Sequence, residues 1–152
     1  MAKSFEELSE MPLDAHKAPA PVPPGHYLVG IAAPAEEILS SQKQTPGFRV
    51  RFRFYQARED VNMETLNKFL EEGNMKLSDV EMTQDFYITE RSSFMFADFI
   101  KKALRLTSAN FKQACADMAG HQLIIQVAQK STQRPDGTMG LRSEVTGHAP
   151  AD

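Results

Sequence analysis

Three arginines alternate with hydrophobic residues in one short segment, and they are the side chains whose spacing most clearly suggests chemistry. The segment Phe48–Phe54 reads Phe-Arg-Val-Arg-Phe-Arg-Phe, the alternation typical of a strand with one buried face. In a strand, Arg49, Arg51 and Arg53 would project from the other face about 6.6 Å apart, close to the spacing of phosphates along an extended single strand. Guanidinium groups bind phosphate through paired hydrogen bonds and stack on bases. The segment therefore indicates a strand that binds phosphates.

Two tyrosines and three further basic residues extend this surface. Tyr55 continues the arginine face, and Tyr87 falls in the next expected strand, where it is expected beside Tyr55. Tyrosine rings stack on any base, so they suit binding that tolerates many sequences. Basic residues also occur in two expected loops, where an oligonucleotide-binding barrel places its binding loops. The candidate nucleic-acid-binding residues are Lys43, Arg49, Arg51, Arg53, Tyr55, Tyr87, Lys130 and Arg134.

The arginines also have simpler interpretations. The outer face of a half-buried strand is usually polar, and arginine is an ordinary solubilising residue there. Residues 59–85 contain eight carboxylates and two lysines, so this acidic segment can pair with the arginines. The segment can also be a solvated helix face, or an autoinhibitory flap that nucleic acid displaces. The arginines alone do not decide between these alternatives.

The distribution of charge matters more than its sum. The net charge is -3, which by itself disfavours a polyanion as ligand. Residues 42–58, however, hold five basic residues and no acid, and residues 91–142 hold eight basic residues and three acids. A positive local field can exist on one face of an acidic protein.

The pattern of the chain predicts a mainly β fold with accessory helices. Strands are expected at 26–31, 48–54, 85–89, 121–128 and 141–146, and helices at 61–77, 92–106 and 109–118. Five strands with helices between the third and the fourth are the order of an OB-fold, a five-stranded Greek-key barrel. A small sheet covered on one side by two helices is the alternative.

The expected domain organisation is simple. Residues 1–24 form a flexible arm rich in proline and alanine, and residues 25–150 form one OB-fold-like domain. An acidic helical insert occupies about 59–82. The C-terminal residues 148–152 are expected to be too short and polar to pack.

Signals for catalysis, cofactors or membranes are weak. The four histidines have no metal-ligand spacing, and the single cysteine, Cys115, falls within an expected helix. No phosphate loop or nucleophile motif occurs, so no enzyme activity and no cofactor are expected. Convergent carboxylates, as in a nuclease, remain a third possibility. Without a leader or a long apolar run, a cytoplasmic protein is predicted.

Several segments resemble phage-encoded single-stranded DNA-binding proteins of the OB-fold type. The opening Pro-Pro-Gly-His-Tyr-Leu-Val of 23–29 resembles their first strand, and Lys43–Phe54 resembles the loop and second strand. The aromatic helix at 96–104, the strand at 120–127 and the closing Val-x-Gly-x-x-Pro of 145–150 fit the same pattern. The C-terminus lacks the acidic, apolar-ended tail with which many bacterial single-strand binders recruit partners.

The resemblance implies an OB-fold and sequence-tolerant binding of single-stranded DNA in phage replication or recombination, in the host cytoplasm. The implied partners are single-stranded DNA, further copies of the chain on that DNA, and replication or recombination proteins. DNA and RNA are not distinguished by any residue. The alternative function is a non-catalytic interaction or scaffold subunit that uses the acidic helix and the Pro-rich arm.

Overall fold

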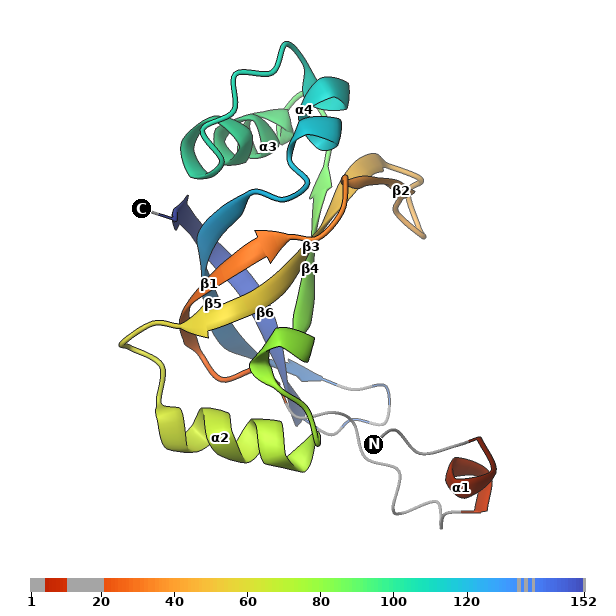
Figure 1. Cartoon of the computed structure of the whole chain (residues 1–152). Helices are drawn as coiled ribbons and strands as arrows, with labels where there is room; N and C mark the ends of the chain where they lie inside the picture. Colours follow the sequence, from red (N-terminus) through yellow and green to blue (C-terminus); the bar gives the residue numbers. More distant parts are fainter. Residues whose placement is uncertain (1–4, 11–20, 134, 136, 138, 152) are drawn as a thin grey trace.

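Six strands pair in an antiparallel sheet, with helices at both ends (Figure 1). The computed structural model describes residues 5–10, 21–133, 135, 137 and 139–151. The elements in chain order are α1 (Phe5–Glu10), β1 (Gly25–Ile31), β2 (Glu36–Leu39), β3 (Pro46–Ala57), α2 (Met63–Glu72), the 3-10 turn η2 (Leu77–Asp79), β4 (Glu81–Tyr87), α3 (Ser93–Asp98), the π-helical turn η3 (Phe99–Ala103), α4 (Phe111–Asp117), β5 (Gln122–Gln133) and β6 (Met139–Pro150). The predicted mainly β fold is confirmed, and α3, η3 and α4 lie between the third and fourth of the predicted strands.

β3 is the central strand of the sheet. Its first residues pair with β2, its last residues pair with β1, and β4 lies along its other side. β1 also pairs with β5, and β5 pairs with β6. In the described part of the chain β4 and β6 share no backbone ladder, so the sheet is open there. A side-chain hydrogen bond crosses this seam, between Nε2 of His148 and Oε1 of Gln84 at 2.6 Å.

The apolar side of β3 forms the centre of the core. Val50, Phe52 and Phe54 are fully buried and Phe48 is half-buried, while the arginines between them face outward. The predicted division of this strand into two faces is therefore confirmed. Phe96 of α3 packs on Phe48, with ring centroids 5.2 Å apart. Helix α3 with η3 thus covers one end of the sheet, as the expected apolar face of 92–106 requires.

Several expected element bounds were wrong. Strand β2 was missed because its Glu-Glu-Ile-Leu sequence has no strand alternation of its own, and the pairing with β3 creates it. Helix α4 begins after Asn110, whose side chain accepts from the Gln113 amide at 2.9 Å, and not after Ser108. The Ser108 hydroxyl instead donates to Asp117 at 2.7 Å. Between the last two predicted strands, where a loop would be expected, residues 131–133 and 139–140 are strand residues that pair in the β5–β6 ladder.

Residues 148–150 pack on the sheet, contrary to the prediction for 148–152; Asp152 lies outside the described residues. β6 continues through Pro150, which lies opposite Leu123 of β5. The His148 ring lies against the ring of Phe99, with centroids 4.8 Å apart, and near Phe52 and Phe86. Cross-strand pairing and this aromatic pocket fix a segment whose polar composition suggested a free tail.

The last residues assigned to the arm also pack on the domain. The carbonyl of Val22 accepts hydrogen bonds from Gln129 at 3.2 Å and from Ser143 at 2.9 Å. The Tyr27 hydroxyl donates to the carbonyl of Pro23 at 2.7 Å. Residues 21–24 therefore anchor the chain where β5 and β6 pair. The rest of the expected arm, apart from α1, lies outside the described residues.

Candidate nucleic-acid interface

The outward side chains of β3 form one row with aromatic residues at both ends. Arg49, Arg51 and Arg53 follow one another along the strand, and Tyr55 comes next. Tyr87, at the end of β4, lies opposite Gly47 at the start of β3. Tyr87 is therefore not beside Tyr55, as the sequence suggested. The strand positions of Tyr55 and Gly47 are eight residues apart, about 26 Å along an extended strand, with the three arginines between them.

Each arginine of this row has a carboxylate partner on a neighbouring strand. Arg49 makes a two-pronged contact with Asp85 of β4, Nε to Oδ1 at 2.8 Å and Nη2 to Oδ2 at 3.2 Å. This hydrogen-bonded carboxylate raises the pKa of the Arg49 guanidinium further above its usual value. The other two ion pairs are longer: Arg51 to Glu36 at 3.6 Å, and Arg53 to Glu81 at 4.0 Å.

The acidic segment thus does pair with the arginines, through Asp85 and Glu81. Both carboxylates belong to β4, an integral strand of the sheet. The interpretation of this segment as a displaceable flap is therefore wrong for these two groups. Glu36, the third partner, lies on the missed strand β2 and outside the acidic segment. All three arginines keep 41–51% of their side-chain surface exposed, so a ligand can still reach them.

Both tyrosine rings lie over glycines of the adjacent strand. A Cβ built on Gly30 would stand 2.5 Å from Cε2 and 2.6 Å from Oη of Tyr55. A Cβ built on Gly47 would stand 3.0 Å from Cδ1 of Tyr87. Tyr55 also sits at a β-bulge, because the β1–β3 register shifts between Leu28 and Val29. With 47% of Tyr55 and 37% of Tyr87 exposed, each ring rests on backbone and presents surface to solvent.

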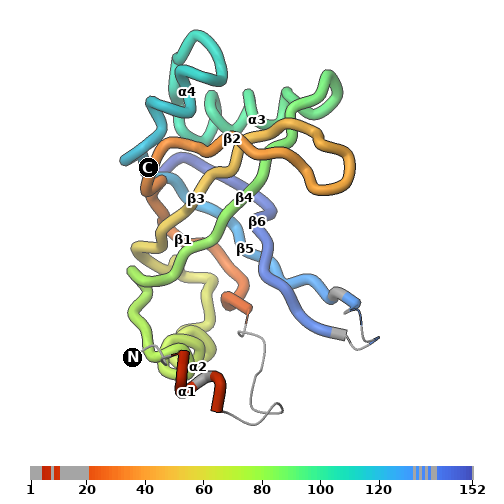
Figure 2. The backbone as a smooth tube through the Cα atoms, turned by 90° about the vertical axis from the view of Figure 1, so that its right-hand side faces the viewer, coloured from red at the N-terminus to blue at the C-terminus, as the bar shows by residue number. Residues whose placement is uncertain are grey.

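The predicted loop residues separate into two places. Lys43, in the β2–β3 turn, lines a shallow depression together with Tyr87 and Thr89. Lys130 is a strand residue of β5 rather than a loop residue, and Arg134 lies outside the described residues. The β2–β3 and β5–β6 hairpins project to the same side of the molecule (Figure 2).

Sequence reasoning missed one basic residue, Arg142. It lies directly opposite Lys130 in the β5–β6 ladder, and its Nη2 stands 3.7 Å from Oε2 of Glu144. Like charges placed opposite each other destabilise a strand pair. The β5–β6 hairpin therefore concentrates positive charge at a cost in stability. Only the register reveals the pair, because the two residues are twelve positions apart in the sequence.

The contact between Gly30 and Tyr55 gives a stability prediction. Gly30→Ala should lower the free energy of unfolding by about 1 kcal/mol, because the new methyl group forces the half-exposed ring aside. In the Tyr55→Ala background the same change should cost much less, since nothing is left to displace. Urea unfolding of the two single variants and the double variant measures this coupling. If the double variant loses as much stability as the two single variants together, the contact between Gly30 and the Tyr55 ring is contradicted.

No family model matches the chain, and no curated protein matches it. Among the described residues, no helix is long and apolar enough to cross a membrane. Nor does this part of the chain gather three or more His, Cys, Asp or Glu side chains in a way that could hold a metal ion.

Proposed function

We propose that the protein binds single-stranded DNA, without strong sequence preference, along the outer face of β3. The observation that carries the proposal is the row of Arg49, Arg51 and Arg53 between Tyr55 and Tyr87. Arginines spaced two residues apart match successive phosphates, and the flanking rings supply stacking surfaces for bases. The row, about 26 Å long, would hold about four nucleotides, which is the lower end of the site sizes known for one OB-fold. We place this activity, which needs no catalysis, in phage replication or recombination.

The strand order supports the proposal. β1, β3 and β4 form a meander, the helices follow, and the β5–β6 hairpin returns to β1. This order is compatible with the OB-type Greek key that we propose, whose closure would join β4 to β6. His148 and Gln84 already meet across that seam. In an OB-fold, the strand 2–3 face and two adjacent hairpin loops form the binding surface; under this proposal β3, β4 and the two projecting hairpins would take their place.

The Lys130–Arg142 pair gives further support from the side of the β5–β6 hairpin. Two like charges on facing strands lower the stability of the fold. A bound polyanion would neutralise both charges and so offset this cost. Phosphates leaving the β3 row toward this hairpin would meet them. Contacts of this kind add affinity for any sequence and steepen its dependence on salt.

The carboxylates of β4 should limit the affinity. Phosphate must compete with Asp85 for Arg49 and with Glu81 for Arg53. We therefore expect the double variant Glu81→Gln, Asp85→Asn to bind single-stranded DNA about fivefold more tightly, from about 1 kcal/mol of released competition. Fluorescence anisotropy with a labelled oligonucleotide measures the change.

Glu72→Gln and Glu71→Gln together make the matched control for this variant. They remove the same charge from α2, where no described ion pair reaches the arginine row. Equal gains in the control and in the β4 variant would show that net charge alone acts. No gain in the β4 variant would mean that the arginines do not contact the DNA.

The ion pairs also favour a second candidate function, an interaction or scaffold subunit whose arginines only bind the strands of its own sheet together. One titration separates the two functions. A labelled oligo-dT of about 30 nucleotides, a length that exceeds one OB-fold site, is titrated at low and moderate salt beside a duplex of equal length. Preference for the single strand, weakened by salt, supports DNA binding. Absence of binding at low salt would leave the scaffold function.

A further inference from the structure

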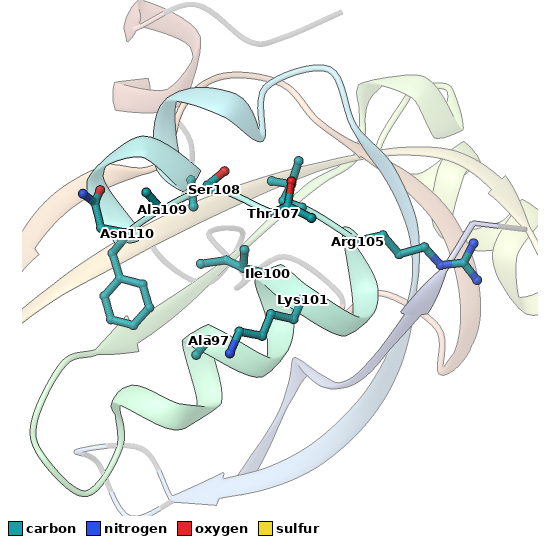
Figure 3. Close-up of a pocket in the computed structure, with 11 residues that line it drawn as sticks. Ala97, Ile100, Lys101, Arg105, Thr107, Ser108, Ala109 and Asn110 are labelled. Carbon is teal, nitrogen blue, oxygen red and sulfur yellow. The ribbon is translucent and has the colours of Figure 1, made fainter.

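A groove at the helical end of the molecule lies apart from the arginine row. It runs between α3–η3 and α4, and its volume is about 640 Å³ (Figure 3). Its lining is largely apolar, and the apolar residues are Ala97, Ile100, Leu106, Ala109, Phe111 and Ala114. No described element covers this surface. A groove of this composition can accept an apolar side chain presented by a short segment.

The rim of the groove is basic. Lys101 and Arg105 both line it, and Figure 3 shows the Lys101 side chain extending along α3 beside Ala97. Residues 91–112 contain five basic residues and one acid, Asp98, which pairs with Lys102 at 3.5 Å. Within the described residues Lys101 has no carboxylate partner. The groove therefore suits an occupant that combines an apolar side chain with carboxylates.

The N-terminal segment of the same chain has this chemistry. Residues 1–14 hold four acids and one lysine. Helix α1 carries Glu6 and Glu7 in its first turn, and its Phe5 is 84% exposed. A large exposed aromatic side chain flanked by carboxylates complements an apolar groove with a basic rim.

The placement of the two elements indicates contact between copies. α1 lies at the opposite end of the sheet from α3 and α4 in both views (Figures 1 and 2). Residues 11–20 join α1 to the domain; fully extended, ten residues span about 35 Å. We propose that α1 of one molecule docks into the α3–α4 groove of a second copy, with Phe5 in the groove and its carboxylates on Lys101. Because the two surfaces differ, the association is head-to-tail and can continue along a chain of copies.

A peptide titration tests the contact directly. A labelled peptide of residues 1–14 is titrated with the full chain carrying Phe5→Ala, so that the chain's own segment competes less. We expect saturable binding that Lys101→Glu in the full chain weakens about fivefold, the scale of one rim charge pair. Ala97→Glu, which places a carboxylate within the groove, should abolish it.

Lys102→Glu is the matched control, because it makes the same charge change one residue along and does not line the groove. Circular dichroism checks that each variant is folded. Binding that is absent, or equally weakened by Lys101→Glu and Lys102→Glu, would overturn the proposal.

Sedimentation of the unmodified chain supplies the second measurement. Its mass should rise with concentration, and Phe5→Ala should reduce the rise. A charge exchange, Glu6→Lys with Lys101→Glu, should restore the association that each single variant weakens. A mass that stays monomeric while the peptide still binds would show docking within one chain and refute the contact between copies.

The consequence on DNA rests on the proposed function, whereas the association itself does not. Phe5→Ala should lower cooperativity on a long oligo-dT while leaving unchanged the affinity for an oligomer of about four nucleotides, the length that one arginine row would hold. If the chain binds no DNA but still associates, only the proposed function fails. If it binds long DNA with no cooperativity and does not associate, only the head-to-tail contact fails.

Discussion

Replacing Tyr55 with alanine is expected to weaken single-stranded DNA binding about tenfold to a hundredfold, the value of one stacked base. The ring rests on Gly30, is 47% exposed and ends the arginine row, so it offers one face to a base without first having to be ordered. Anisotropy with an oligo-dT measures the loss. The salt dependence should change little, because the number of phosphate contacts stays the same.

Tyr55→Phe separates stacking from other roles of this residue. It keeps the aromatic face and should bind within about twofold of the unmodified chain. Urea unfolding of both variants shows whether the fold is retained. If the phenylalanine variant loses as much affinity as the alanine variant, stacking is not what Tyr55 contributes. If neither variant loses affinity, the DNA does not follow this row.

His148 gives the second large effect, on stability rather than binding. Burial among phenylalanine rings lowers the pKa of its imidazole from 6.5 to about 4. At a pH between these two pKa values, the imidazole is mostly protonated in the unfolded chain and mostly neutral in the folded chain. The free energy of unfolding should therefore fall as the pH drops below 6.5, by at most about 1.4 kcal/mol per pH unit. From pH 6.5 to pH 5 the expected loss is about 1.6 kcal/mol.

His148→Gln tests the assignment, because glutamine has no proton to gain and can still hydrogen-bond across the seam. Urea unfolding at pH 7, 6 and 5 should show a smaller slope for the variant. Hydrogen bonds from His26 lower the pKa of Asp60, so the contribution of Asp60 to stability is lost at more acidic pH. If the free energy of unfolding falls equally with pH in the variant and the unmodified chain, a group other than His148 causes the acid sensitivity.

The sequence predicted those features that depend on the residues of a single element. The two faces of β3 follow from a strict alternation of apolar and arginine residues, and no contact with another element is needed to see it. The same holds for the apolar face of α3. The extent of β6 could not be predicted, since residues such as Gly147 and His148 are ordered by pairing with β5 and by rings contributed from β3, β4 and η3.

The candidate site was predictable as a set of residues but not as an arrangement. Alternation placed Arg49, Arg51 and Arg53 on one face, yet their carboxylate partners depend on the β3–β4 and β2–β3 registers. The positions of Tyr87 and Lys130 were misjudged for the same reason. Register is a property of two segments together, so a single segment cannot disclose which side chains meet.

The tyrosines resting on glycines have a consequence for inheritance. Gly30 and Tyr55 are separated by 25 positions in the sequence, but the Tyr55 ring fills the space that a side chain at position 30 would need. A substitution at one position therefore constrains which residues the other position can hold. In descendants of this chain, a larger residue at position 30 should arise together with loss of the aromatic ring at position 55. Gly47 and Tyr87 should vary as a second linked pair. Selection for the two tyrosines as a stacking surface would thus also conserve the two glycines beneath them, although neither glycine would contact the ligand.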